Sequence, residues 1–444
     1  MSDTDKNTNP MKKITQLQPA TYINNTTLFT LAGVPFTMWK TVLTGLSARM
    51  NLGLGGDAGM GKSQLLADIR ALYGNNASYV LCRNDMDIRS LFRQMNFRKL
   101  VDAMKEGGTV SQKDLSEITS RIYKPLTVAE ELDRAAEIVQ NQLFNVFEGF
   151  IELDGDIHSL GGTEVKTFRD FAGKEYKRNV AYSVGVWSAN MGNGSYTGTV
   201  SMDKAMKERS HLIINVKNFR PGGENPSDLD NILLGCEGEI RLKSQEKPED
   251  HTQDFINAFT YLKQKAKTPN PAELGEELLL FRYLVQGLDY IPCQAADNSK
   301  SKMEDVWPSK AEEEGIGSED DIIMYRMIYP ASVRVAQTMI SFARALREYA
   351  KAENPKAKPT VQDSVIEAFK LIAAYSGMMQ NPQRITEGYV GNHYRASCDA
   401  AKVIKARLDG KKDLIQAINY FKGEGKPLPK SVLDECSGEF ACWK

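Results

Sequence analysis

The fold of this chain is decided by one stretch near its start, Gly56-Asp57-Ala58-Gly59-Met60-Gly61-Lys62-Ser63. This stretch fits the pattern G-x-x-x-x-G-K-[ST], in which the backbone N–H groups of a glycine-rich loop wrap a polyphosphate. In that pattern Lys62 supplies a positive charge to the β- and γ-phosphates, and Ser63 offers a hydroxyl to Mg²⁺. The stretch therefore predicts ATP as the ligand and Mg²⁺ as its companion ion.

The residues on either side of the loop supply the strand and the helix that the motif needs. Residues 50–55 are consistent with a short buried strand, although Gly53 and Gly55 lower its strand propensity. After the loop, apolar residues recur at helical spacing up to Leu72, and Gly74 can end the helix. The residues expected to bind the nucleotide are Gly56, Asp57, Ala58, Gly59, Met60, Gly61, Lys62, Ser63 and Gln64.

Composition limits the class of protein. The 444 residues imply more than one domain, and 56 basic residues against 57 acidic ones leave no overall footprint for nucleic acid or an anionic membrane. The six cysteines lack C-x-x-C spacing and the four histidines are scattered, which argues against a zinc site or a disulfide framework. Because no apolar run approaches eighteen residues and the start is polar, we expect a cytoplasmic protein without a signal peptide or membrane span.

The order of apolar runs predicts the organisation of the chain. Between about 27 and 216, short apolar runs such as 77–82 and 211–216 alternate with helical patterns, which favours a parallel sheet covered by helices. From 252 onward helical patterns dominate, so an α/β nucleotide domain is followed by a helical one. The expected divisions are a flexible tail (1–25), the α/β core (26–220), a helical and loop insertion (221–325), a second helical domain (326–384) and a helical extension (385–444).

Hydrolysis of ATP also needs carboxylates that hold Mg²⁺ and orient the attacking water. The apolar residues 126–128 lead into Glu130 and Glu131, at the carboxyl end of a predicted strand, where open α/β sheets gather their ligands. We expect Glu130 to hold Mg²⁺ together with Ser63, and Glu131 to orient the water. The alternative for these residues is the start of a charged helix. Residues 150–154 also end in a carboxylate, but Gly155 after them favours a hairpin.

Five further stretches follow one another in a distinctive order. They are E-E-L-D-R-A at 130–135, V-Q-N-Q-L-F-N-V-F-E at 139–148, I-E-L-D-G at 151–155, V-W-S-A-N at 186–190 and G-T-V-S-M-D-K-A-M-K-E-R at 198–209. Together they resemble the MoxR branch of the AAA+ ATPases, which typically reads D-E-I-N-R-A, V-Q-x-A-L-L-E-A-M-E, V-x-x-D-G, F-A-T-Q-N-P and G-T-Y-x-L-x-E-A-x-L-D-R. The resemblance covers roughly 30–216 and 325–380.

The resemblance implies roles for three more residues. Asn190 takes the position of sensor 1, an amide that reports on the γ-phosphate and the attacking water, and Arg209 that of the arginine finger, which reaches a neighbouring subunit's nucleotide. Residues 332–339 are similar to the S-P-R-A start of the family's lid helix, so Arg334 becomes the sensor 2 candidate that couples nucleotide state to lid position. Taken singly, Asn190 and Arg209 fit structural roles better, as an amide in a loop after a strand and an arginine on a helix surface.

The resemblance implies an AAA+ core followed by a helical lid, assembled as a hexameric ring with ATP between subunits. It also implies a chaperone-like remodeller or activator of a protein partner, often one with a von Willebrand factor A domain; the related chelatase ATPases serve metal insertion. Glu130 stands where the family has Asp, and this difference predicts weak hydrolysis. A motor acting on nucleic acid and a ring that switches with little turnover remain the alternatives.

Three other segments invite a functional interpretation. Residues 89–100 mix basic and aromatic side chains, as a nucleic-acid helix does, but we expect Leu91, Phe92, Met95 and Leu100 to form a buried stripe. Residues 152–180 are expected to form a hairpin that faces the ring pore in MoxR-like proteins, or else an ordinary surface hairpin. The basic residues between 402 and 412 are expected to be solvated helix surface.

Overall fold

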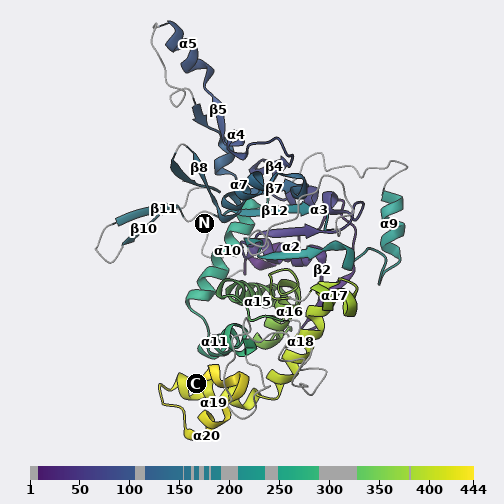
Figure 1. Cartoon of the computed structure of the whole chain (residues 1–444), viewed down its shortest axis with the longest axis vertical. Coiled ribbons are helices and arrows are strands. Elements are labelled where there is room, and N and C mark those ends of the chain that lie inside the picture. Colours follow the sequence, from purple (N-terminus) through teal and green to yellow (C-terminus); the bar gives the residue numbers. More distant parts are fainter. Residues whose placement is uncertain are drawn as a thin grey trace.

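The computed structural model of the chain describes residues 9–105, 116–153, 155–161, 165–169, 175–179, 182–191, 209–235, 249–289, 328–379 and 382–444. These ranges form an α/β body, a helical body below it and two segments that project outward (Figure 1). Asp154 and residues 198–208, which carry part of the family resemblance, lie outside the described residues.

A parallel sheet of five strands forms the centre of the α/β body (Figure 1). Its strands, in spatial order, are β13 (Leu212–Asn215), β3 (Leu52–Gly55), β12 (Val184–Ala189), β7 (Leu126–Glu130) and β4 (Ala77–Leu81). The two runs predicted as strands from their apolar composition are thus β4 and β13. Since all five strands are parallel, their last residues lie along one edge of the sheet, here called the carboxyl edge, and their first residues along the amino edge.

Helices cover both faces of this sheet, as a parallel sheet requires. On one face α2 (Met38–Ser47) and α3 (Lys62–Ala71) bury apolar side chains such as Leu65 and Ile69 in a cluster that continues into the helical body. On the other face α7 (Glu137–Glu148) buries Leu143 and Phe147 in a separate cluster. The loop between β3 and α3 therefore emerges at the carboxyl edge of a sheet that is packed on both sides.

The two glycines that make β3 a poor strand by propensity are explained by packing. A Cβ atom on Gly53 would lie 2.2 Å from the ring of Trp187 on the neighbouring strand β12, and one on Gly55 would lie 1.9 Å from the sulfur of Met191. Trp187 is fully buried, and its indole N–H donates to the hydroxyl of Ser210 at 2.7 Å. The glycines leave room for one of the largest side chains of the core.

Residues 9–25 correct the prediction of a flexible tail over 1–25. Helix α1 (Met11–Thr15) buries Met11 and Ile14 completely, against α2 and α15 (Val333–Glu353). The following residues are fixed by Asp68 of α3, which accepts hydrogen bonds from the backbone N–H groups of Thr21 and Tyr22, both at 2.8 Å. The polar composition hid two apolar residues three positions apart, which lie on one face of a short helix.

The C-terminal part of the chain is helical, as predicted. Helix α15 begins after Ser332, whose hydroxyl accepts from the backbone N–H of Val335, and Thr360 caps α16 in the same way. In sequence order the helices are α10 (Thr252–Lys267), α11 (Pro271–Gln286), α15, α16 (Val361–Ile372), α17 (Pro382–Tyr389), α18 (His393–Asp409), α19 (Lys412–Gly423) and α20 (Lys430–Glu435).

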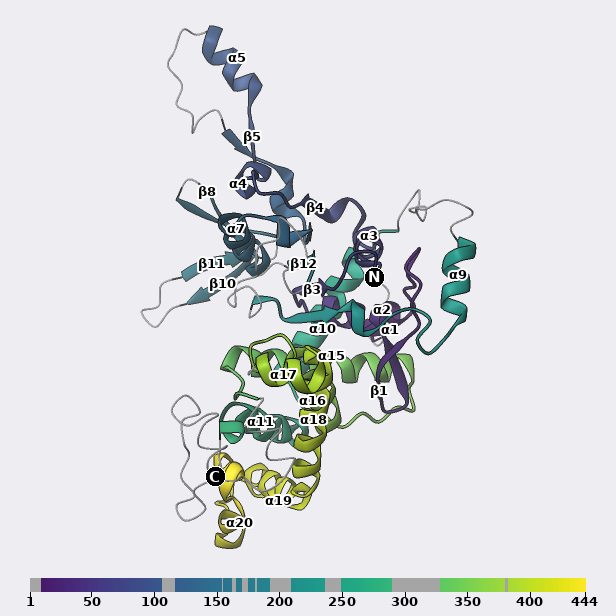
Figure 2. The same cartoon turned by 45° about the vertical axis from the view of Figure 1, so that its right-hand side comes forward.

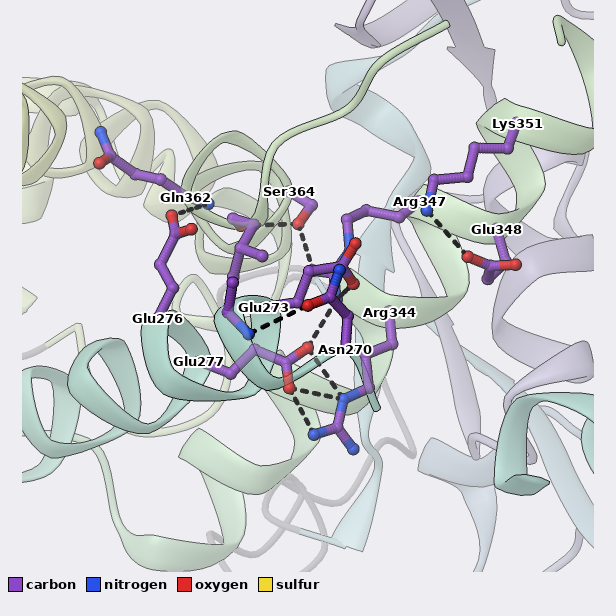
Figure 3. Close-up of polar contacts among 12 residues, drawn as sticks. Asn270, Glu273, Glu276, Glu277, Arg344, Arg347, Glu348, Lys351, Gln362 and Ser364 are labelled. Carbon is purple, nitrogen blue, oxygen red and sulfur yellow. Dashed lines mark hydrogen bonds and ion pairs between the residues drawn. The ribbon is translucent and has the colours of Figure 1, made fainter. Parts of the chain in front are cut away.

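A buried ion cluster ties three of these helices together (Figure 3). Glu277 of α11 accepts from Arg344 and Arg347 of α15, and Arg347 also donates to the hydroxyl of Ser364 on α16 at 2.9 Å. Glu277 and Arg347 are each 3% exposed. Burial by itself would raise the pKa of Glu277, but the hydrogen bonds from the two arginines outweigh it and lower that pKa. The carboxylate is thus held in its charged form.

Two segments stand away from the body (Figures 1 and 2). One runs through β5 (Arg93–Met95), α5 (Phe97–Lys105) and β6 (Ser116–Ile118), and the other is α9 (Ser227–Gly235). The expected buried stripe over 91–100 is therefore wrong in part: α4 (Ile88–Leu91) ends early, and although Phe92 is buried, Met95 is 53% exposed on the projecting strand.

Antiparallel hairpins complete the described structure. Strands β8 (Phe150–Leu153) and β9 (Asp156–Ser159) form the hairpin predicted around Gly155, and β10 (Val165–Arg169) pairs with β11 (Glu175–Asn179) in the region expected to contain a hairpin. Strands β1 (Thr27–Leu31) and β2 (Val34–Thr37) form another. No helix among the described residues is long and apolar enough to cross a membrane.

The packing of β3 predicts the effect of a single methyl group. Gly53→Ala should lower the free energy of unfolding by about 1–3 kcal/mol, because the new Cβ overlaps the Trp187 ring. The measurement is chemical denaturation. Gly388→Ala is the matched control, since a Cβ there meets nothing within 4 Å; a loss as large in the control would remove the packing explanation.

The ion cluster predicts a large effect from the loss of one carboxylate. Glu277→Ala should lower the free energy of unfolding by about 3–5 kcal/mol, because Arg347 stays buried without its partner. Glu424→Ala removes an exposed ion pair with Lys426 and should change stability by less than about 1 kcal/mol. Equal losses in the two variants, measured by thermal unfolding, would contradict the assignment.

Candidate nucleotide site at the two edges of the sheet

The predicted phosphate-binding loop lies at the carboxyl edge, between β3 and α3. Gly59 and Gly61 have φ angles of 77° and 76°, a region that favours glycine, so the loop can turn tightly into the helix. The Lys62 ammonium donates to the carbonyl oxygens of Gly56 and Asp57 at 2.8 and 2.7 Å. Burial lowers the pKa of Lys62, and the nearby carboxylates of Asp133, Asp57 and Glu131 oppose that shift.

Glu130 ends β7 on the face of the sheet that α3 covers. Its carboxylate accepts a hydrogen bond of 2.5 Å from the hydroxyl of Tyr79 on β4, and the guanidinium of Arg70 on α3 lies over the tyrosine ring. Burial, followed by this hydrogen bond, raises the pKa of Tyr79 to about 12, so the tyrosine stays a donor at neutral pH. The predicted Mg²⁺ ligand therefore has a fixed neighbour that the sequence did not suggest.

Glu131 occupies an unusual backbone position directly after β7. Its φ angle is 56°, a left-handed conformation that a non-glycine residue adopts only when its surroundings hold it there. Its backbone N–H donates to the hydroxyl of Ser188 on β12 at 3.3 Å, and its carboxylate pairs with Arg134 at 3.2 Å. Backbone strain of this kind concentrates at functional sites, in keeping with the role predicted for Glu131.

Asn190 lies directly after β12 and connects the loop to a further carboxylate. Its side-chain oxygen accepts from the Lys62 ammonium at 3.0 Å, and its side-chain nitrogen donates to Asp133 at 3.3 Å. The structure thus brings Asn190 to the lysine, as the sensor 1 assignment requires. Asp133 belongs to the E-E-L-D-R-A stretch, yet its sequence pattern gave no reason to assign it a role.

The fit of these residues to Mg²⁺ can be judged from their chemistry. Magnesium bound with a nucleotide takes only one or two protein oxygens and completes its shell with phosphate oxygens and water. Among the described residues no group of three or more histidine, cysteine or carboxylate side chains is arranged to hold an ion alone. The donor set of Ser63 and Glu130 suits an ion that arrives with its nucleotide.

Arg209 and Arg334 lie together at the amino edge. The side-chain nitrogens of Arg209 and Arg334 lie 3.1 and 3.4 Å from the same oxygen of Glu148, the last residue of α7. The Arg209 guanidinium also lies 5.0 Å from the centre of the Phe144 ring. All three charged side chains are partly exposed. Glu148 was part of the resemblance, but nothing in the sequence indicated that it joins the two arginines.

The two groups of residues are separated by the length of the sheet. Helix α7 starts close after the end of β7 and returns over twelve residues, or about 18 Å, to Glu148. Arg209 lies three residues before β13 begins, whereas Asn215 at the end of β13 pairs with Gly55 beside the loop. Within one chain, therefore, the two arginines and Lys62 belong to opposite edges.

Asn51 connects the segments that meet at the amino edge. Its side-chain nitrogen donates to the carbonyl oxygens of Phe147 and Arg209 at 2.9 and 3.2 Å, and its backbone N–H donates to Nδ1 of His211 at 3.0 Å. His211 must be neutral to accept this bond. Burial, followed by the charges of Arg334 and Arg49, lowers the pKa of His211 to about 4.

Part of the chain matches a known protein family. Residues 51–153 match the family model of the AAA domain, dynein-related subfamily. No curated protein sequence matches the chain. The crystal structure of a candidate ATPase from Cytophaga hutchinsonii is similar over 80% of this chain and 87% of its own, at 13% identity and a TM-score of 0.47. A full-length MCM homolog from Methanopyrus kandleri is similar at 12% identity and a TM-score of 0.39, over 77% of this chain and 56% of that one.

The AAA match covers the loop, Glu130, Glu131, α7 and the strand β8 that follows it. Together with the five-stranded parallel sheet and the helical C-terminal part, it confirms the predicted fold class, an α/β AAA+ domain followed by a helical region. Asn190, Arg209 and Arg334 lie beyond the matched residues, so their roles remain predictions.

The low pKa of His211 predicts a pH dependence of stability. Because the folded pKa of about 4 lies below the unfolded value of 6.5, neutral His211 stabilises the fold above pH 6.5, and this contribution is lost as pH falls toward 4. Between pH 7 and pH 5 the loss should be about 2 kcal/mol. In His211→Asn, which keeps an acceptor but does not titrate, denaturation curves should lack this component; an identical pH dependence would contradict it.

Proposed function

We propose that the protein is an ATP-hydrolysing AAA+ ring ATPase whose active site is shared between neighbouring subunits. One observation carries the proposal: the nucleotide-binding loop and its carboxylates lie at one edge of the sheet, and the two arginines lie at the other. A closed ring repeats one contact around its axis, and such a contact can bring the amino edge of each subunit to the carboxyl edge of the next.

At the carboxyl edge each residue has a defined task. The loop from Gly56 to Lys62 binds the phosphates of ATP, while Ser63 and Glu130 hold Mg²⁺. The ion, when bound, neutralises charge on the phosphates. Glu131 orients the attacking water, and Asn190 takes the sensor 1 position, where an amide reports on the γ-phosphate and the attacking water. The hydrogen bond from Tyr79 fixes one oxygen of Glu130 and would leave the other available to Mg²⁺.

At the amino edge the neighbour supplies positive charge. Arg209 and Arg334 share Glu148 in the single subunit, and both guanidinium groups are accessible enough to turn toward a phosphate. Arg209 acts as the arginine finger, a contribution worth about 10³ to 10⁵ in rate, so isolated subunits should be nearly inactive. The position of Arg334 beside Arg209 supports an action on the neighbour's nucleotide that is coupled to the lid.

The biological role follows from the resemblance to the MoxR branch. We infer a cytoplasmic, hexameric ring that remodels or activates a protein partner, with a von Willebrand factor A domain as the class of partner to test. The projecting segment through α5 and the hairpin β10–β11 are the surfaces available for such contacts (Figure 2). A ring that switches with nucleotide but turns over little remains the alternative if Glu130 holds Mg²⁺ poorly.

A nucleic-acid motor is supported by one feature, the projecting segment. It exposes Phe97 beside Arg98 and Lys99, and aromatic and basic side chains together bind single strands. Binding of this kind should weaken steeply with salt, and nucleic acid should stimulate hydrolysis. The near-neutral charge of the chain favours the protein-remodelling function instead.

Subunit mixing tests the shared site. ATPase activity should rise more than linearly with protein concentration and fall at least about tenfold in Lys62→Ala, Glu131→Gln and Arg209→Ala. Mixing Glu131→Gln with Arg209→Ala should restore activity, because mixed rings contain sites with both wild-type edges. Arg395→Ala, which removes an exposed arginine of α18, is the control and should stay active.

Two results would contradict the proposal. Full activity of Glu131→Gln would remove the catalytic assignment, and failure of the mixture to recover, where mixed oligomers form, would remove the shared site. Repeating the assay with single-stranded DNA and RNA decides the alternative, since stimulation by either would favour the nucleic-acid motor.

A further inference from the structure

One buried carboxylate beside the loop has no task in the proposed mechanism. Asp133 lies in the short turn Leu132–Arg134 that follows β7, and it is 4% exposed. One of its oxygens accepts from Asn190, while the other is buried and has no hydrogen-bond partner among the described residues. A buried carboxylate without full pairing destabilises a fold, so its presence here calls for a functional explanation.

The explanation starts from the position of Asn190 between two opposite charges. On one side the Lys62 ammonium has only donors, and on the other the Asp133 carboxylate has only acceptors. The amide satisfies both when its oxygen faces Lys62 and its nitrogen faces Asp133. In the flipped amide the nitrogen would face the Lys62 ammonium, donor against donor, and the oxygen would face the Asp133 carboxylate, acceptor against acceptor. Lys62 and Asp133 therefore jointly fix one orientation of the amide.

The orientation decides what Asn190 can offer to the nucleotide. With its nitrogen held by Asp133, Asn190 presents only a hydrogen-bond acceptor on the side of Lys62 and the phosphates. An acceptor does not bind a phosphate oxygen, but it can accept a hydrogen bond from a water molecule or from Lys62. A flipped Asn190 would instead donate to the γ-phosphate and bind ATP more tightly without helping the water.

We propose that Asp133 is a positioning residue that fixes the Asn190 amide with its oxygen toward the phosphate side, so that Asn190 orients water instead of binding the γ-phosphate. This inference rests on the proposed ATPase function. Asp133 itself touches no phosphate and acts through Asn190. Its unpaired oxygen is explained in the same way, since a second partner would draw the carboxylate away from the amide.

The test is Asp133→Asn, which keeps the shape of the side chain but adds a donor that can pair with a flipped Asn190. Dissociation constants for ATPγS and ADP and the turnover of ATP are measured on the full-length protein. We expect ATPγS to bind at least about tenfold more tightly relative to ADP, the size of one added hydrogen bond to a charged group, while turnover falls. A purely structural defect would weaken both nucleotides together.

Two controls separate orientation from charge. Asp85→Asn removes an exposed carboxylate that the proposed site does not use and should leave the ratio of the two dissociation constants within about twofold of wild type. In an Asn190→Ala background Asp133→Asn should no longer change the ratio, because no amide remains to flip. Asp133→Ala, which frees the amide without adding a donor, should shift the ratio in the same direction and serves if Asp133→Asn fails to fold.

Each outcome bears on one claim. An unchanged ratio in folded Asp133→Asn, or an equal shift in the Asn190→Ala background or in Asp85→Asn, would overturn the positioning role while leaving the ATPase assignment intact. A wild-type protein that binds neither nucleotide would overturn both.

Discussion

The parallel arrangement of five short strands is the constraint on which the rest of this structure depends. Because every strand runs the same way, groups that follow the strands gather at the carboxyl edge, and groups that precede them gather at the amino edge. Four to six residues per strand set the two edges about 13–20 Å apart. Neither edge holds both the lysine and the arginines, so the site that we propose requires a second copy.

The packing of β3 limits which residues this sheet can carry. The strand lies between β13 and β12 and delivers the loop, yet its glycines contribute no side chains to the core. The missing volume is filled from the neighbouring strand by Trp187, which is held by Ser210, and Ser210 directly follows Arg209. The close approach of a ring to a backbone thus links the loop strand to the segment that carries an arginine. The loop at the carboxyl edge and Arg209 at the amino edge therefore both depend on the contact between Gly53 and Trp187.

Local signals made part of this structure predictable from the sequence. The loop, the strand ending in Glu130 and the helix cap at Thr360 each depend on residues a few positions apart, and all three are present. The packing of residues 9–25 was missed because Met11 and Ile14 are buried by tertiary contacts, with α2 and with the much more distant α15, that leave no local pattern. The early end of α4 was missed because apolar residues three or four positions apart do not show where the chain stops packing against the α/β body and enters the projecting segment.

The candidate site divides in the same way. Lys62 and Glu131 could be assigned from their motifs, whereas Asp133 and Glu148 stood within recognised stretches without a signal of their own. Their hydrogen-bond partners are distant in the sequence: Asn190 lies 57 residues beyond Asp133, and Arg334 lies 186 residues beyond Glu148. A pairing across such distances leaves no periodicity in the sequence, so only the folded chain reveals it.

The charges of the two edges suggest how subunits find each other. Around the loop Lys62 lies near Asp133, Lys217 pairs with Asp57 at 2.8 Å, and Arg134 pairs with Glu131 at 3.2 Å, so these charges nearly balance at this edge. At the amino edge two guanidinium groups share one carboxylate, which leaves a net positive charge. Opposite charges steer association and fix its register, even where each exposed pair adds little affinity. Bound ATP would make the carboxyl edge negative and attract the positive amino edge of a neighbour, so nucleotide binding and subunit contact are expected to reinforce each other.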